Sequence, residues 1–232
     1  MIKSINREIE LRHEYLNTSE LETIYFGGGT PSILKKGEFI SIFNTIQKIY
    51  TLKENAEISV ECNPDDLSEE KLTLLYDLGV NRLSIGIQSF KDSDLIFMNR
   101  SHNKIQSLKS IKMAQKIGFK NISIDLIFSL PNQTLNSWEE NLEIAFNLGI
   151  QHISSYSLTI EEKTKLFQLI KKGEISELDD ISSSKQFKML IEKSKEMGFI
   201  HYEISNFGRK GFFSKHNSYY WIGKRYLGIG PS

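Results

Sequence analysis

A run of three glycines is the first segment of this sequence with the composition of a ligand-binding loop. Gly27–Gly29 follow a short β-branched run and are followed by Thr30 and Pro31. Consecutive glycines let the backbone adopt positive φ and approach a ligand closely, which exposes N–H and C=O groups. An ordinary strand-to-helix turn with Pro31 at the start of the helix explains the same residues. The segment has neither the lysine of a P-loop nor the GxGxxG spacing.

Four polar or charged side chains are further candidates for a binding site. Glu61 could accept hydrogen bonds from a ligand amine or a ribose hydroxyl, or form a salt bridge at the rim of a sheet. Gln88 offers both a donor and an acceptor, although it could equally be a satisfied interior amide. Arg100 could hold a carboxylate in a bidentate pair, although a loop arginine is usually solvated. Asp125 lies in the middle of a predicted strand and is the strongest single candidate.

The C-terminal segment contains a dense group of rings. His216, Tyr219, Tyr220 and Trp221 fall within six residues. Such a group could bind a planar aromatic ligand, or its imidazole could supply an axial metal bond. Aromatic core packing near a turn is the alternative. The other histidines singled out are interpreted as structural, and these are His13, His152 and His201.

Composition excludes several classes of protein. The 232 residues include 29 basic and 29 acidic side chains, so the net charge is zero and gives no electrostatic support for nucleic-acid or membrane-surface binding. The single cysteine, Cys62, excludes a disulfide framework and a zinc or iron–sulfur site built from this chain's own thiolates. The first residues lack a signal-peptide core, and no apolar run reaches the roughly 18 residues that span a bilayer, so we expect a cytoplasmic protein.

Strand and helix patterns alternate about every 30 residues. Short β-branched runs begin near Thr23, Glu57, Arg82, Asn121 and His152. The helical patterns between them cover 37–50, 68–78, 105–117 and 137–148, and several end before a glycine. This order predicts βαβ units and a parallel sheet. Residues 2–16 predict a helix with no strand before it, and Asp65 and Asp66 are expected to cap the helix that begins near Ser68.

The predicted strands have one small, polar side. Ile58, Val60 and Cys62 alternate with Glu57, Ser59 and Glu61, and the runs at 82–88 and 121–129 alternate in the same way. Both faces of a helix-covered parallel sheet are normally apolar, and burying unpaired carboxylates would cost several kcal/mol. We therefore predict a barrel or partial barrel whose bore holds a polar ligand at the carboxyl ends of the strands.

Six segments together resemble a known family in their order along the chain. They are GGGTPSIL, ECNPDDL, GVNRLSIGIQSF, DLIFSLPNQT, SYSLTIEEKT and HYEISNFGRKG…HNSYYW…YLGIGP. This set is similar to the radical SAM proteins related to oxygen-independent coproporphyrinogen III oxidase. The last three segments, and the HNxxYW element above all, resemble the HemW haem-chaperone branch. The resemblance covers nearly the whole chain.

The resemblance implies cofactors and site residues. Gly28, Gly29 and Thr30 match the segment that meets the methionine moiety of S-adenosylmethionine. The other S-adenosylmethionine positions match Glu61, Gln88, Arg100 and Asp125, and His216 matches the histidine proposed to take part in haem binding. The family's [4Fe–4S] cluster is held by a CxxxCxxC-type loop that this chain does not contain. The cluster is therefore expected only in a full-length parent, and this chain is expected to have no metal ligands and no catalytic residues of its own.

The resulting expectation is an α/β fold, a partial (β/α)6 TIM-like radical SAM barrel lacking its first strand. Residues 1–200 would form the barrel, and 201–232 would begin a truncated C-terminal extension. We expect an internal fragment of a longer protein, inactive as given, with a cluster-less paralogue as the alternative. The parent would bind haem and pass it to respiratory haem proteins, and it could associate peripherally with a membrane through those partners. The alternatives are anaerobic coproporphyrinogen III oxidation, or a plain haem- or nucleotide-binding module.

Overall fold

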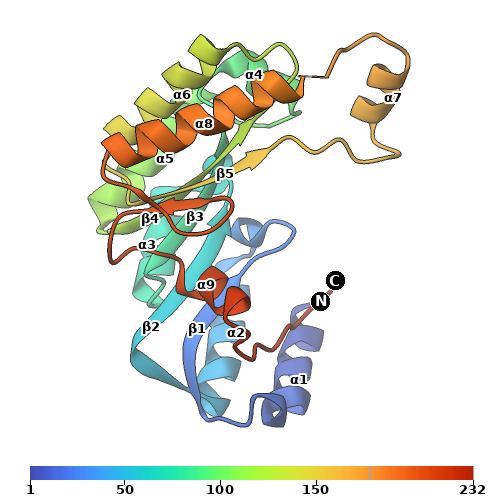
Figure 1. Cartoon of the computed structure of the whole chain (residues 1–232). Helices are drawn as coiled ribbons and strands as arrows, with labels where there is room; N and C mark the ends of the chain where they lie inside the picture. Colours follow the sequence, from blue (N-terminus) through green and yellow to red (C-terminus); the bar gives the residue numbers. More distant parts are fainter. Residues whose placement is uncertain (178, 232) are drawn as a thin grey trace.

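One curled sheet organises the computed structural model, which describes residues 1–177 and 179–231 (Figure 1). Within these residues the sheet has seven strands in the order β1-β2-β3-β4-β5-β7-β6. They are β1 (Glu20–Phe26), β2 (Thr51–Cys62), β3 (Arg82–Gln88), β4 (Asn121–Phe128), β5 (His152–Ser157), β6 (Ile200–His201) and β7 (Asn206–Gly208). Strands β1 to β5 pair in parallel, and β7 pairs antiparallel with both β5 and β6. The predicted partial α/β barrel is confirmed.

The described helices are α1 (Ile2–Arg12), α2 (Lys36–Ile49), α3 (Glu69–Asp77), α4 (Asp92–Phe97), α5 (Lys104–Ile117), α6 (Leu135–Asn147), α7 (Lys165–Lys171), α8 (Asp180–Glu196) and α9 (Lys215–Trp221). Helices α2, α3, α5 and α6 connect the parallel strands and cover one face of the sheet, whereas α1 precedes the first strand, α7 projects away from the sheet, and α9 follows the last strand and lies against β1 (Figure 1). Three 3₁₀ turns complete the described elements: η1 (His13–Leu16), η2 (Pro31–Ile33) and η3 (Pro64–Asp66). The predicted helix-ending glycines Gly79, Gly118 and Gly149 all have positive φ.

The core lies between the helices and the apolar side of the strands. Leu83, Ile85 and Ile87 on β3 are fully buried, as are Ile124 and Leu126 on β4. Each such side chain contributes about 1.5–3 kcal/mol by leaving water. Because side chains alternate along a strand, this arrangement places the polar side chains of the same strands in the bore. The predicted alternation is therefore present in the structure.

The prediction that Asp65 and Asp66 cap α3 is wrong. The cap is Ser68, whose hydroxyl accepts the Lys71 N–H at 3.1 Å. Asp65 and Asp66 lie in η3, one turn too early, where they accept hydrogen bonds from Ser101 and Ser32. A residue caps a helix only from the position directly before it, and Ser68 occupies that position.

Sequence periodicity did not predict the last part of the sheet. Strand β7 runs opposite to the other strands, between β5 and β6, and the expected domain boundary at residue 200 falls within β6. The following segment returns to the first two strands, where α9 lies against β1 (Figure 1). In the part of the chain that the structure describes, no helix is long and apolar enough to cross a bilayer.

Candidate functional site

A cavity of about 170 Å³ lies at the carboxyl ends of β1 to β4. Six of the residues selected from the sequence line it together: Gly29, Thr30, Glu61, Gln88, Arg100 and Asp125. The rest of its lining is Pro31, Cys62, Asn63, Ser84 and Gly86. Residues that are almost 100 positions apart in the sequence thus share one polar cavity, because parallel strands present their carboxyl ends at the same edge of the sheet.

The glycine loop forms one wall of this cavity. Gly28 and Gly29 have φ of 72° and 61°, and no atom lies within 4 Å of the position that a Cβ would take at either residue. The backbone there is open to a ligand. Gly28 does not line the cavity itself, but its N–H donates to Glu61 Oε2 at 3.0 Å. The loop is thereby held against the end of β2.

Glu61 is bound by neutral donors instead of a cation. Its Oε1 accepts the Tyr25 hydroxyl at 2.5 Å, while its Oε2 accepts the Gly28 N–H. Among the described residues no lysine or arginine forms an ion pair with Glu61, so the alternative of a rim salt bridge is not what the structure shows. A carboxylate oriented by two donors can still accept further hydrogen bonds from a ligand.

Asp125 projects from β4 into the bore. The Ser84 hydroxyl donates to its Oδ1 at 3.1 Å. Burial raises the pKa of Asp125 to about 6, partly opposed by the hydroxyls of Ser84 and Ser154. A carboxyl group held in the bore at such a cost is typical of a functional position, although structural networks also shift pKa values.

Gln88 and Arg100 reach across the end of β3. A Cβ on Gly86 would lie 2.9 Å from Gln88 Nε2 and 3.5 Å from Arg100 Nη2, so both side chains pass over that glycine. The Arg100 guanidinium donates to Asn63 Oδ1 at 2.6 Å. Gln88 itself has a φ of 65°, which is uncommon for a residue other than glycine and turns the chain sharply at the cavity. The guanidinium is therefore held beside the cavity and not solvated on a loop.

The opposite end of the bore is closed by residues of the C-terminal segment. Arg82 is buried and donates to Asn121 Oδ1 at 2.6 Å and to the Phe212 carbonyl at 3.2 Å. His152 contacts Ser123 through Nδ1 and the Tyr202 hydroxyl through Nε2. Burial, with a smaller effect of the Arg82 cation, lowers the pKa of His152 well below its ordinary value. A neutral, fully hydrogen-bonded imidazole agrees with the structural role predicted for His152.

His216 lies outside the cavity, on α9. Its ring stacks on Tyr25 with centroids 4.6 Å apart, and its Nδ1 lies 3.2 Å from the Thr23 hydroxyl. Within residues 1–177 and 179–231 no hydrogen bond to Nε2 is found, and the ring is half-buried. Tyr220 contacts the His216 ring edge-on at 5.3 Å, whereas Tyr220 and Trp221 are 51% and 63% exposed. The predicted group of rings is thus mainly a surface feature.

Sequence reasoning missed three polar residues at the cavity or beside it. Ser84 was placed on the polar side of its strand but was not selected, and Asn63 directly follows β2. Tyr25 lies on the bore face of β1, two residues from Thr23, and its hydroxyl reaches Glu61. The same period-two pattern that selected Glu61 and Asp125 could have found Ser84 and Tyr25.

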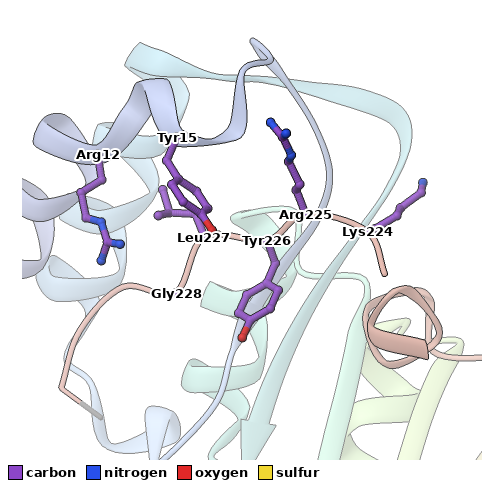
Figure 2. Close-up of a pocket in the computed structure, with 7 residues that line it drawn as sticks. All are labelled: Arg12, Tyr15, Lys224, Arg225, Tyr226, Leu227 and Gly228. Carbon is purple, nitrogen blue, oxygen red and sulfur yellow. The ribbon is translucent and has the colours of Figure 1, made fainter. Parts of the chain in front are cut away.

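A second, larger cavity of about 420 Å³ lies between η1 and the segment 224–228 (Figure 2). It is lined by Arg12, Tyr15, Lys224, Arg225, Tyr226, Leu227 and Gly228. The cationic side chains point in different directions, and two of them are already paired: Arg12 with Glu8, and Lys224 with Glu22 (Figure 2). This cavity therefore lacks the convergent polar groups of the first.

The chain's own cysteine is not placed for metal binding. Cys62 is buried among apolar side chains, and its thiol donates to the Val60 carbonyl at 3.6 Å. Burial raises the pKa of this thiol. Among the described residues no group of three histidine, cysteine or acidic side chains is arranged to hold a metal ion.

A half-barrel of parallel strands with a polar cavity at their carboxyl ends defines a partial α/β barrel protein. A family model for the "Radical SAM superfamily" matches residues 4–145. The chain belongs to that superfamily. This result confirms the family expected from the ordered motifs.

Two curated relatives show which group within the superfamily this chain resembles. The chain is 39% identical over 229 residues to "Heme chaperone HemW" of Bacillus subtilis, covering 95% of this chain and 60% of that protein. It is 33% identical over 231 residues to the mitochondrial "Radical S-adenosyl methionine domain-containing protein 1" of Danio rerio, covering 52% of that protein. The chain thus spans a little over half the length of these relatives. It is HemW-like within the superfamily.

The fold itself matches a known enzyme structure. Coproporphyrinogen III oxidase (HemN) from Escherichia coli aligns with a TM-score of 0.79 at 22% identity, covering 96% of this chain and 50% of that one. At this identity the match supports the fold of the chain and not its activity.

Proposed function

We propose that this chain supplies the S-adenosylmethionine-binding part of a HemW-like haem chaperone. The observation that carries the proposal is the convergence of Gly29, Thr30, Glu61, Gln88, Arg100 and Asp125 on one cavity. These residues were selected as S-adenosylmethionine positions, and the fold gathers them from three strands and two loops. The membership of the chain in the radical SAM superfamily supports the same ligand.

The donors and acceptors around the cavity fit the chemistry of S-adenosylmethionine. The open backbone at Gly28 and Gly29 has room for the methionine moiety. Glu61 and Asp125 can accept hydrogen bonds from an amino group or from ribose hydroxyls, and Arg100 can pair with a carboxylate. Gln88 can both donate and accept at the edge of a base or sugar. We assign these side chains to binding and orientation.

An iron–sulfur cluster is a different case. In the superfamily a [4Fe–4S] cluster, when bound, would supply the radical chemistry of S-adenosylmethionine, and cysteine thiolates would hold it. The one cysteine of this chain is buried on the helix side of β2. Such a cluster needs several accessible thiolates, so the described residues of this chain do not fit it. We derive no step through the cluster, and the role proposed for the cavity of this chain is to bind and orient S-adenosylmethionine.

Haem is the cargo that we propose for the whole protein. His216 Nε2 could bind the haem iron, while Tyr220 and Trp221 expose rings that could contact the macrocycle. The relatives called haem chaperones support haem as the ligand. Delivery to respiratory haem proteins is part of the same proposal.

A haem titration tests the assignment of His216. Haem is added to the wild-type chain and to His216→Ala, and binding is followed by visible absorption. We expect the variant to bind at least tenfold more weakly, because an iron–imidazole bond is lost. His13→Ala is the matched control, since the His13 side chain is half-exposed on η1 and contacts only Glu10 and Glu14. Equal affinities of the wild-type chain and His216→Ala would contradict the assignment.

A further inference from the structure

Tyr25 contacts both of the proposed binding sites. Its ring stacks on the His216 ring with an interplanar angle of 11°, and its hydroxyl donates to Glu61 Oε1 at 2.5 Å. Glu61 in turn accepts the N–H of Gly28 in the glycine loop. One side chain on β1 therefore lies between the imidazole of α9 and the wall of the S-adenosylmethionine cavity.

The His216 side of this contact is fixed by buried groups. Glu57 is 5% exposed, and its two oxygens accept the N–H groups of Lys215 and His216 at 3.0 and 3.1 Å. A carboxylate at the first turn of a helix stabilises it through these otherwise unpaired N–H groups. The Ser214 hydroxyl caps the same turn by accepting the Asn217 N–H. These bonds to the first turn of α9 therefore fix the position of His216 over β1.

The Glu61 side is equally constrained. The Tyr25 ring lies over Gly27 so closely that a Cβ at that glycine would overlap it. Burial, and next the neighbouring Glu61 carboxylate, raises the pKa of Tyr25 far above its ordinary value, so the hydroxyl keeps its proton and donates. The glycine at position 27 therefore leaves room for the Tyr25 ring, and the hydroxyl bond ties the ring to the Glu61 carboxylate.

We propose that Tyr25 is a positioning residue that couples the two sites, holding Glu61 for S-adenosylmethionine and the His216 ring for haem. This inference rests on the function proposed above. Because a coupling free energy acts equally in both directions, S-adenosylmethionine changes the affinity for haem by the same factor as haem changes the affinity for S-adenosylmethionine.

Two substitutions separate the two contacts of Tyr25. Tyr25→Phe removes the hydroxyl and keeps the stacked ring, whereas Tyr25→Leu removes both. The readouts are the dissociation constant for S-adenosylmethionine by calorimetry and the NMR shift of the His216 ring protons, assigned with His216→Ala. Tyr50→Phe is the matched control, since Tyr50 loses one hydroxyl bond, to the His13 carbonyl, away from both sites.

We expect both Tyr25 variants to bind S-adenosylmethionine about tenfold more weakly, the loss typical of a hydrogen bond to a charged group. The His216 ring protons keep their upfield shift in Tyr25→Phe and lose it in Tyr25→Leu. In the wild-type chain, the haem dissociation constants with and without saturating S-adenosylmethionine differ at least threefold. In Tyr25→Leu the ratio of these two constants falls to one.

The coupling is refuted if Tyr25→Phe binds S-adenosylmethionine within twofold of the wild-type chain, or if the ratio is unchanged in Tyr25→Leu. An unmoved His216 resonance in Tyr25→Leu refutes the stacking role independently of any ligand. A wild-type chain that binds neither S-adenosylmethionine nor haem refutes the proposed function, and the coupling with it. If the wild-type chain binds both ligands and the two Tyr25 variants bind them as Tyr50→Phe does, the coupling alone is refuted.

Discussion

Replacing Asp125 by asparagine removes a carboxyl group whose burial in the bore lowers the stability of the folded chain when it is ionised. The folded-state pKa of about 6 exceeds the ordinary value of 3.8, so the folded state binds the proton more tightly than the unfolded state. Stability therefore falls as pH rises from about 4 to 6, and the cost is complete above pH 6. A difference of about two pKa units corresponds to at most about 3 kcal/mol.

The expected result is a pH-dependent gain in stability for Asp125→Asn. An asparagine carries no charge to desolvate, and its amide oxygen can still accept the Ser84 hydroxyl. Relative to the wild-type chain, the free energy of unfolding of the variant should rise by up to about 2 kcal/mol between pH 4.5 and pH 7.5, because about a third of the cost is already present at pH 4.5. Binding of S-adenosylmethionine should weaken in the same variant, because an ionised acceptor is lost.

Urea unfolding followed by circular dichroism at four pH values between 4.5 and 7.5 measures this difference. Asp65→Asn is the control, because the Asp65 carboxylate is exposed and accepts only the Ser101 hydroxyl. A constant difference in unfolding free energy between the wild-type chain and Asp125→Asn across this range would refute the reasoning, since burial of the charge would then have no cost.

Three further predictions concern α9, a helix cap and the cysteine. Glu57→Ala should release the first turn of α9 and speed hydrogen exchange at the His216 amide at least tenfold, whereas Glu54→Ala, at an exposed site, should not. Equal exchange rates in the two variants would show that Glu57 does not hold this turn. Thr134→Ala should lower the free energy of unfolding by about 1 kcal/mol through loss of the α6 cap, and an unchanged urea midpoint would show that the cap is dispensable. Anaerobic reconstitution with iron and sulfide should leave the chain without a stoichiometric [4Fe–4S] cluster because Cys62 is its only thiol, and iron analysis showing four irons per chain would overturn this.

Local patterns predicted most of the parallel sheet. The helices at α2, α3, α5 and α6 begin and end within two residues of their predicted bounds, since apolar periodicity and the terminal glycines act within one or two turns. The alternation along β2 to β4 predicted the polar bore for the same reason. Strands β1 and β2 begin several residues earlier than expected, because polar residues such as Glu20 and Thr51 pair at the open edge of the sheet.

The closure of the bore could not be predicted in this way. The contacts of Arg82 with Phe212, and of Glu57 with His216, join residues more than 120 positions apart and leave no local period. His216 was selected for its motif, but its stacking on Tyr25 depends on the path of residues 209–214 across the sheet. Likewise, Tyr25 became a candidate only when the structure placed its hydroxyl on Glu61.

The central claim is that the cavity at the carboxyl ends of the strands holds S-adenosylmethionine. Titration of the isotopically labelled chain with S-adenosylmethionine, followed by amide NMR, tests it most directly. We expect shifts at Gly28, Gly29, Gly86 and Arg100 that saturate together and disappear in a combined Glu61→Gln, Asp125→Asn variant. Shifts confined to the cavity around Tyr15 and Gly228, or no shifts at all, would contradict it.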